Sequence, residues 1–125
     1  MFRSLVVASA LSLLTAASAA TPPVQVTYRV YHYTCDAGKK ISVSYVSYGQ
    51  EPMFAVLDWN GARYGLAQAI SGSGARYAGL YGPVGARGGL QWWEHQGKAD
   101  LSTFTGNSTV TTKTLLTGCK TPTQR

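Results

Sequence analysis

The sequence predicts a small all-β domain of about eight short antiparallel strands, and three observations support this fold class. After residue 20, apolar and polar residues alternate along the chain, and no window has the 3.6-residue periodicity of an amphipathic helix. Glycine-rich turn signals, drawn from 14 glycines, recur about every 8–12 residues. Apolar residues make up 45% of the 125 residues, so a single domain of this length can bury a core.

The first 19 residues have the features of a secretory signal peptide. Arg3 supplies a short positive start, an apolar stretch covers 5–15, and Ala17 to Ala19 form a small-x-small cleavage site. A transmembrane anchor is the alternative, but the apolar stretch is shorter than the ~20 residues that a span needs. We expect residues 1–19 to be removed and residues 20–125 to form a periplasmic or secreted domain. No cysteine lies near the cleavage site, so we expect no lipid anchor.

The first two strands are predicted at Val24–Tyr33 and Ile41–Tyr48, because both segments alternate with a period of two. In the first strand, four apolar side chains share one face: Val24, Val26, Tyr28 and Val30. In the second, Ile41, Val43 and Tyr45 are expected to face inward, with serines facing outward.

The third and fourth strands form a predicted hairpin. They span Met53–Trp59 and Arg63–Ile70, and Asn60-Gly61 lies between them. Asn-Gly is the strongest short hairpin signal, because both central residues of a type I′ turn need a positive φ.

The segment Ser71–Gly74 (SGSG) then interrupts the pattern, and the fifth and sixth strands are predicted at Arg76–Tyr81 and Leu90–His95. A glycine-rich loop is expected between these two strands, over residues 82–89. Since successive side chains of a strand point to opposite faces, one of Trp92 and Trp93 is expected in the core and the other at the surface.

The last two strands are predicted at Ala99–Phe104 and Val110–Leu116, the first of them after a turn at Gln96–Lys98. A glycosylation sequon at residues 107–109 would matter only in a eukaryotic host. A meander of eight short strands exposes fewest edges when it closes into a barrel or a compact sandwich.

Two cysteines, Cys35 and Cys119, lie near the two ends of the predicted domain. An even cysteine count in an exported protein predicts a disulfide. The alternative is a metal site that adds His32 and His95, but the spacing matches no common zinc pattern. We therefore expect a disulfide and no metal.

The formal charge of the chain is +6, and without Arg3 ten basic and five acidic side chains remain, a net charge of +5. A basic chain with many aromatics could bind single-stranded nucleic acid. However, the basic residues are scattered, with no cluster larger than Lys39-Lys40, and an exported protein does not meet nucleic acid. We interpret the positive excess as a solvated surface that aids solubility.

Signatures of enzymes are absent from the sequence. Ser73 does not lie in the G-x-S-x-G pattern of a nucleophile elbow, and no phosphate-binding glycine motif occurs, so no cofactor is expected. A hydrolase with an unrecognised carboxylate pair stays as a weaker alternative. Its candidates are five acidic residues without obvious pairing: Asp36, Glu51, Asp58, Glu94 and Asp100.

Two motifs carry a resemblance to a known family. The first is Tyr33-x-Cys35-x-x-Gly38-x-x-Ile41-x-Val43-x-Tyr45, and the second is Ser71-Gly72-Ser73-Gly74-Ala75-Arg76-Tyr77. They are followed by a strand with Trp92-Trp93, by Ala99-x-Leu101 and by a closing cysteine. In these features the chain, from about Tyr28 to Cys119, resembles the MliC/PliC inhibitors of c-type lysozyme from Gram-negative bacteria. Without a lipid-attachment cysteine it is most similar to the periplasmic PliC type.

The resemblance implies an eight-stranded antiparallel β-barrel whose partner is a c-type lysozyme. It also implies that a serine of the SGSGARY loop enters the lysozyme cleft together with a lysine from a W-x-K-G turn. Ser73 matches the serine best and Ser71 is its neighbour, while Gly72 and Gly74 keep the loop tip narrow. Arg76 and Tyr77 complete the motif as structural or contacting residues.

The second motif departs from the family pattern. Counting from Trp93 places His95 at the lysine position, whereas Lys98 supplies the cation if one residue is inserted. A neutral His95 can still hydrogen-bond a carboxylate, and a protonated one binds it more strongly. An alternative function, a barrel that binds a cell-wall glycan or another periplasmic ligand through its aromatic side chains, follows from the composition.

Overall fold

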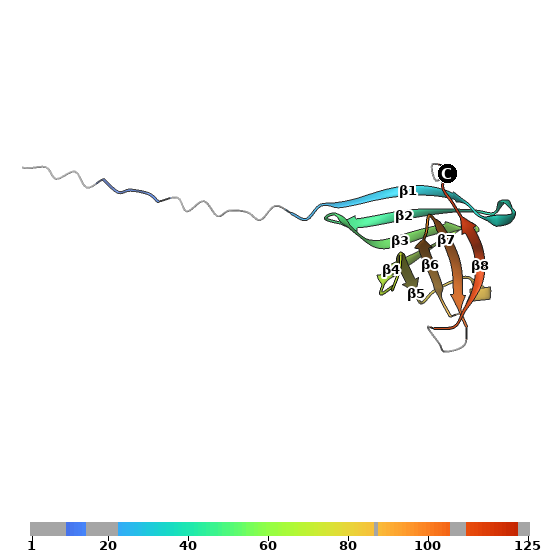
Figure 1. The fold of residues 1–125 in the computed structure, drawn as a ribbon. Coiled ribbons are helices and arrows are strands. Elements are labelled where there is room, and N and C mark those ends of the chain that lie inside the picture. Colours follow the sequence, from blue (N-terminus) through green and yellow to red (C-terminus); the bar gives the residue numbers. More distant parts are fainter. Residues whose placement is uncertain (1–9, 15–22, 87, 106–109, 123–125) are drawn as a thin grey trace, which may run out of the picture.

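A computed structural model describes residues 10–14, 23–86, 88–105 and 110–122. Eight strands follow one another along the chain (Figure 1): β1 (Val26–Thr34), β2 (Lys40–Tyr48), β3 (Glu51–Trp59), β4 (Ala62–Ala69), β5 (Ala75–Gly79), β6 (Leu90–His95), β7 (Lys98–Phe104) and β8 (Thr112–Cys119). Two short 3₁₀ helices, η1 (Asp36–Gly38) and η2 (Val84–Ala86), lie in the connections. No helix among the described residues is both long and apolar enough to cross a membrane.

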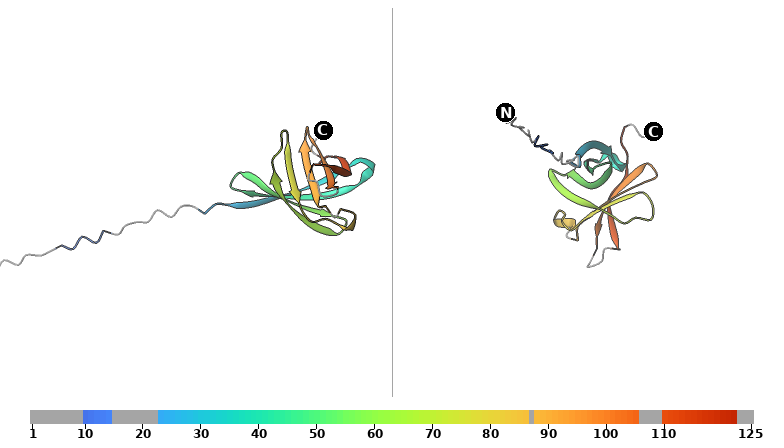
Figure 2. Two further views of the ribbon diagram at one scale, coloured as in Figure 1. Left: turned by 90° about the horizontal axis from the view of Figure 1, so that it is seen from below. Right: turned by 90° about the vertical axis from the view of Figure 1, so that its left-hand side faces the viewer.

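The strands form one antiparallel sheet in sequence order, which confirms the predicted all-β fold class. The sheet curls around on itself (Figure 2), and its last strand returns to the end of its first. Thr34 and Lys120 make the closing bridge, where each backbone N–H donates to the other residue's carbonyl at 2.9 and 3.0 Å. The predicted barrel is therefore a curled half-barrel, closed at one corner and open along the rest of β1.

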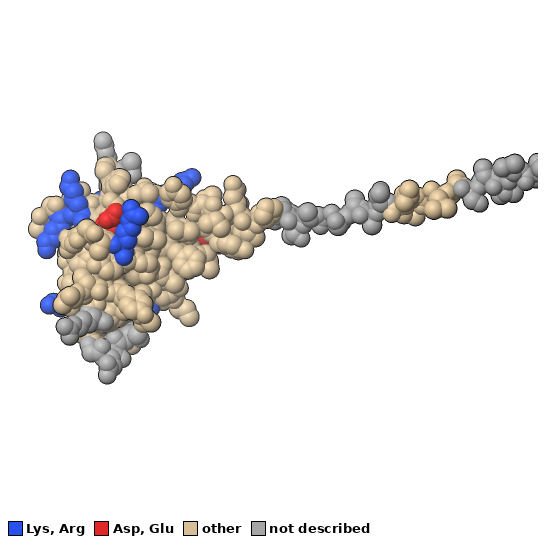
Figure 3. Space-filling view, turned by 180° about the vertical axis from the view of Figure 1, so that it is seen from behind, with Lys and Arg blue, Asp and Glu red and all other residues tan. Residues whose placement is uncertain are grey.

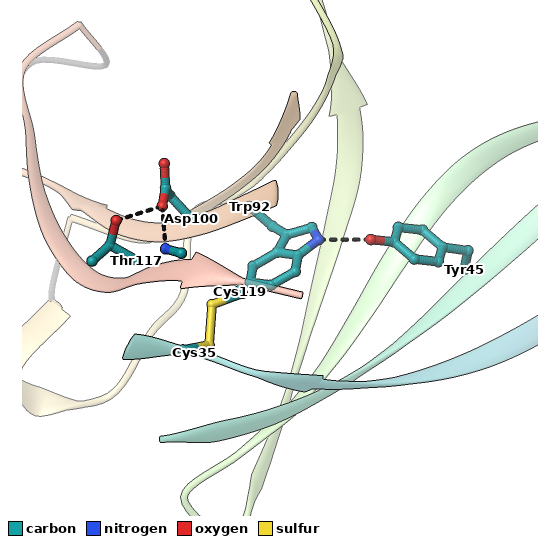
Figure 4. Close-up of a disulfide and its surroundings, with 7 residues drawn as sticks. Cys35, Tyr45, Trp92, Asp100, Thr117 and Cys119 are labelled. Carbon is teal, nitrogen blue, oxygen red and sulfur yellow. Dashed lines mark hydrogen bonds between the residues drawn. A yellow bond between two sulfur atoms is a disulfide. The ribbon is translucent and has the colours of Figure 1, made fainter. Parts of the chain in front are cut away.

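The predicted disulfide between Cys35 and Cys119 is confirmed (Figure 4). It lies beside the closing bridge, because the two cysteines are the chain neighbours of Thr34 and Lys120. It joins residues 84 positions apart in the sequence, and both cysteines are buried. The bridge therefore fastens the first strand of the half-barrel to its last.

The core fills the concave side of the sheet, and the inward orientation predicted for Ile41, Val43 and Tyr45 is confirmed. The prediction that one of the adjacent tryptophans is internal is also confirmed, since Trp92 is fully buried and Trp93 is half-buried. The largest fully buried side chains come from β2 to β7: Trp92, Tyr77, Leu57, Leu66, Leu90, Leu101 and Val43.

Five predicted strand boundaries are wrong by two or three residues: the start of β1, the start of β3, the end of β5 and both ends of β8. The last strand runs to Cys119 because the disulfide and the Thr34–Lys120 bridge hold its end in the sheet. The fifth strand stops at Gly79, where the backbone of Gly89 packs so closely that an added Cβ would lie 2.1 Å from the Gly79 carbonyl oxygen. The first strand begins at Val26, and its apolar face is the exposed one, because only Tyr33 of this strand is buried.

Most of the predicted signal peptide, and all of the sequon at residues 107–109, lie outside the described residues. Both stay predictions from the sequence.

Candidate functional site

The SGSG loop and the β6–β7 hairpin lie against each other at one end of the half-barrel. The antiparallel pairing of β5 with β6 brings them together, because the loop precedes β5 and the hairpin turn follows β6. Gly74 touches the hairpin so closely that a Cβ on it would lie 1.9 Å from the Glu94 carbonyl oxygen and 2.8 Å from the His95 Cβ. Between loop and hairpin is a shallow pocket whose lining includes Gly74, His95 and Lys98.

Two hydrogen bonds shape the loop at Ser73. The Ser71 hydroxyl donates to the Ser73 carbonyl oxygen, and the Trp93 Nε1–H donates to the same oxygen at 2.9 Å. The Ser73 side chain is exposed, and its hydroxyl has no hydrogen-bond partner among the described residues. Ser71 is thus engaged in holding the loop, whereas Ser73 presents a free hydroxyl.

Arg76 and Tyr77, at the start and in the middle of β5, hold the SGSG loop and the strand that follows it in place. The Arg76 Nη1 donates to the Ile70 carbonyl oxygen at 3.2 Å, and its Nε donates to the Gln91 side-chain oxygen on β6. Tyr77 is buried in the core, with its ring 5.6 Å from that of Tyr45. Arg76 braces the loop, and Tyr77 anchors β5 in the core.

His95 and Lys98 are paired across the hairpin, so their side chains lie on the same face. The two turn residues between them, Gln96 and Gly97, have φ of 52° and 74°, as a type I′ turn requires. Both side chains therefore stay candidates for the cation that the hairpin would present.

His95 is oriented by two neighbours that sequence reasoning did not assign. Its ring lies 4.9 Å from that of Trp93, and its Nε2 lies 3.9 Å from the Asp100 Oδ2. The other Asp100 oxygen accepts hydrogen bonds from the Thr117 hydroxyl and the Gly118 N–H, which fixes this carboxylate to β8 (Figure 4). The sequence does not identify Asp100 as the residue that orients His95, because Asp100 meets Thr117 and Gly118 only through the β7–β8 pairing.

A buried polar network that the sequence analysis missed lies behind the hairpin. The Glu94 Oε1 accepts hydrogen bonds from the Tyr33 hydroxyl, at 2.7 Å, and from the Tyr45 hydroxyl. Tyr45 in turn accepts a 2.7 Å hydrogen bond from the Trp92 Nε1–H (Figure 4). Burial, and after it the negative charge of Glu94, raises the pKa of Tyr45 far above the ordinary tyrosine value. Its hydroxyl is therefore a permanent donor.

On the face shown in Figure 3, the basic side chains do not form one continuous patch. Lys and Arg lie there in separate groups, with an acidic side chain beside one of them. Among the described residues, the ion pairs are Arg63 with Asp58, at 3.8 Å, and His95 with Asp100. Any binding through this surface therefore depends on local contacts rather than on a uniform field.

Comparisons with known proteins show what the chain resembles. Residues 33–109 match the family model described as MliC, the membrane-bound lysozyme-inhibitor of c-type lysozyme. Lipoprotein LprI of Mycobacterium tuberculosis, and its counterpart in Mycobacterium bovis, are each 38% identical over 82 residues. This alignment covers 66% of the chain and 34% of those proteins, so the chain spans about a third of the length of the curated relatives it matches.

Among solved structures, the crystal structure of Pseudomonas aeruginosa MliC in complex with hen egg white lysozyme matches with a TM-score of 0.51. The two chains are 20% identical, and the alignment covers 96% of this chain and 99% of the other. At this identity the likeness supports the fold alone.

Proposed function

Because the chain belongs to the MliC family of lysozyme inhibitors, we propose that it inhibits c-type lysozyme by placing the SGSG loop and the β6–β7 hairpin in the active-site cleft. The observation that carries this proposal is the contact between Gly74 and the Glu94–His95 backbone, which joins a free hydroxyl and two basic side chains into one projecting surface. The P. aeruginosa relative, whose structure was solved as a lysozyme complex, supports lysozyme as the partner.

The chemistry of the two surfaces is complementary. Lysozyme cleaves glycosides with one carboxylic acid of raised pKa and one ionised carboxylate. The Ser73 hydroxyl can donate a hydrogen bond to one of these groups, and Lys98 or protonated His95 can form a charge-assisted bond with the other. Occupying both groups stops hydrolysis, because each is needed in the reaction.

The loop serine has the clearest test. We expect Ser73→Ala to weaken inhibition by about tenfold, since one hydrogen bond to a charged group contributes roughly 1.5 kcal/mol. The unfolding free energy should stay within about 0.5 kcal/mol of wild type, because this hydroxyl holds nothing inside the protein. Inhibition titrations and urea unfolding measure the two quantities.

Ser71→Ala is the matched control. It removes the hydrogen bond that Ser71 makes to the Ser73 carbonyl but leaves the Ser73 hydroxyl in place. A smaller loss of inhibition is expected than for Ser73→Ala. An equal or larger loss would assign the contact with lysozyme to Ser71 instead.

His95 is one of the two basic side chains that the hairpin can offer to a lysozyme carboxylate. His95→Gln keeps a hydrogen-bond donor but removes the imidazole, so inhibition should weaken, while Asp100 and Lys98, which face His95, are unaltered. An inhibition constant equal to that of wild type would exclude His95 from the contact.

We further propose that the protein is exported and acts as a binding protein rather than a hydrolase. The predicted signal peptide supports export. Two of the described carboxylates have structural partners: Glu94 accepts from buried tyrosines and Asp100 holds β8. These contacts give both carboxylates a structural role, which supports a binding protein.

A lysis assay tests the proposed function as a whole. The mature protein, starting at Ala20 with its disulfide formed, is added to c-type, g-type and i-type lysozymes acting on bacterial cells. Selective loss of c-type activity is expected. A folded sample that leaves c-type lysis unchanged at micromolar excess, at acid and neutral pH, would overturn the proposal.

A further inference from the structure

A second concave site lies on the inner face of the open side of the half-barrel. It is a pocket of about 550 Å³, within the range on the order of 300–1,000 Å³ that small-molecule sites occupy. Its walls come mainly from β1, β2 and the β2–β3 turn, with Pro52 of β3, Glu94 of β6 and Thr121 completing the lining. It shares Tyr33 and Glu94 with the lining of the pocket between the SGSG loop and the hairpin, but Tyr31 and Arg29 line this pocket and not that one.

The floor of this pocket is rigid. Tyr33 and Tyr45 are buried and both donate to Glu94, so their rings and the carboxylate hold one another in place. Tyr31 stands beside them, with its ring 5.7 Å from that of Tyr45 in an edge-on arrangement, and it is 37% exposed. The pocket thus offers one accessible aromatic ring above a fixed polar floor.

The polar groups of the pocket are left with spare bonding capacity. Glu94 uses only Oε1 for the tyrosines, and no described side chain donates to its Oε2. Arg29 also lines the pocket, is exposed, and makes no hydrogen bond or ion pair with any described residue. Both residues line the pocket, and both keep hydrogen-bonding capacity that no described side chain uses.

These features select the class of ligand. The charged side chains of the lining are Arg29 and Glu94, which cancel, so the pocket favours neither a cation nor an anion. A sugar ring has apolar C–H faces that suit a tyrosine ring and hydroxyls that both donate and accept. We propose that this pocket binds a short neutral oligosaccharide, with a sugar ring against Tyr31 and hydroxyls bonded to Glu94 and Arg29.

This site goes beyond lysozyme inhibition and does not depend on it. The test therefore uses the mature protein alone, titrated with the N-acetylglucosamine trimer and with maltotriose, and monitored by calorimetry. Binding of at least one of the two is expected, and Tyr31→Ala should weaken it by about tenfold or more, as the loss of an aromatic anchor does. Tyr31→Phe, which keeps the ring, should retain most of the affinity.

Tyr28→Ala is the matched control, because Tyr28 lies on the same strand but on its outer face, where it is 73% exposed. It should bind the sugar as wild type does, and Arg29→Gln should weaken binding several-fold. Thermal unfolding of each variant confirms that it is folded. The proposal is overturned if folded wild type binds neither sugar at millimolar concentration, or if Tyr28→Ala and Tyr31→Ala lose affinity equally.

Discussion

Replacing Gly74 with alanine should nearly abolish lysozyme inhibition and also destabilise the fold. Gly74 has a φ of +65°, and its missing Cβ would lie 1.9 Å from the Glu94 carbonyl oxygen. Backbone atoms of a paired strand cannot move aside cheaply, so the loop must lift away from the hairpin. We expect a loss of about 2–4 kcal/mol in unfolding free energy, from backbone strain and overpacking. The inhibition constant should weaken by at least about a hundredfold.

Gly72→Ala provides the comparison within the same loop. No atom lies within 4 Å of a Cβ built on Gly72. Its unfolding free energy, from urea titration, should therefore match that of wild type within about 0.5 kcal/mol. If the two glycine variants were equally stable and equally inhibitory, the contact between loop and hairpin would have no part in either property.

Removal of the disulfide should have the largest effect on stability. The Cys35–Cys119 bridge closes a loop of 84 residues, for which the chain-entropy account gives about 4–5 kcal/mol. In the folded protein, the backbone bridge between Thr34 and Lys120 remains beside this position when the disulfide is removed. Urea unfolding of the Cys35→Ala/Cys119→Ala double variant should show a loss of this size.

Wild type unfolded in the presence of a reductant should behave as the double variant does. If the unfolding free energies of oxidised wild type and the double variant differed by less than about 1 kcal/mol, the backbone bridge and the core would close the half-barrel without the disulfide. Inhibition by the double variant, measured well below its unfolding midpoint, should persist, because the loop and hairpin are held by β5 and β6.

The strands could be predicted because their signals are local. Alternation in β2 identified Ile41, Val43 and Tyr45 as inward, and Asn60-Gly61 identified a tight turn, which has φ of 51° and 77°. Strand boundaries were less accurate. They depend on contacts between distant segments, such as the approach of Gly89 to Gly79 and the bond between the two cysteines.

The site could be predicted only as a set of residues, not as an arrangement. The motif indicated the loop, but the hydrogen bond from Trp93 to the Ser73 carbonyl depends on the pairing of β5 with β6. The Glu94 network likewise joins β1, β2 and β6. Glu94 lies 61 residues after Tyr33 and 49 residues after Tyr45 in the sequence. No short sequence window contains such partners.

The most direct test of the central claim uses a small soluble substrate instead of bacterial cells. Hydrolysis of a chromogenic chitooligosaccharide by hen egg white lysozyme is measured while the mature protein is titrated in, with the substrate in large excess over both proteins. A protein that fills the active-site cleft should stop hydrolysis at about one equivalent, and Gly74→Ala should not. Unchanged hydrolysis of the small substrate, with cell lysis still suppressed, would show that the protein shields the cell wall and would contradict insertion into the lysozyme cleft.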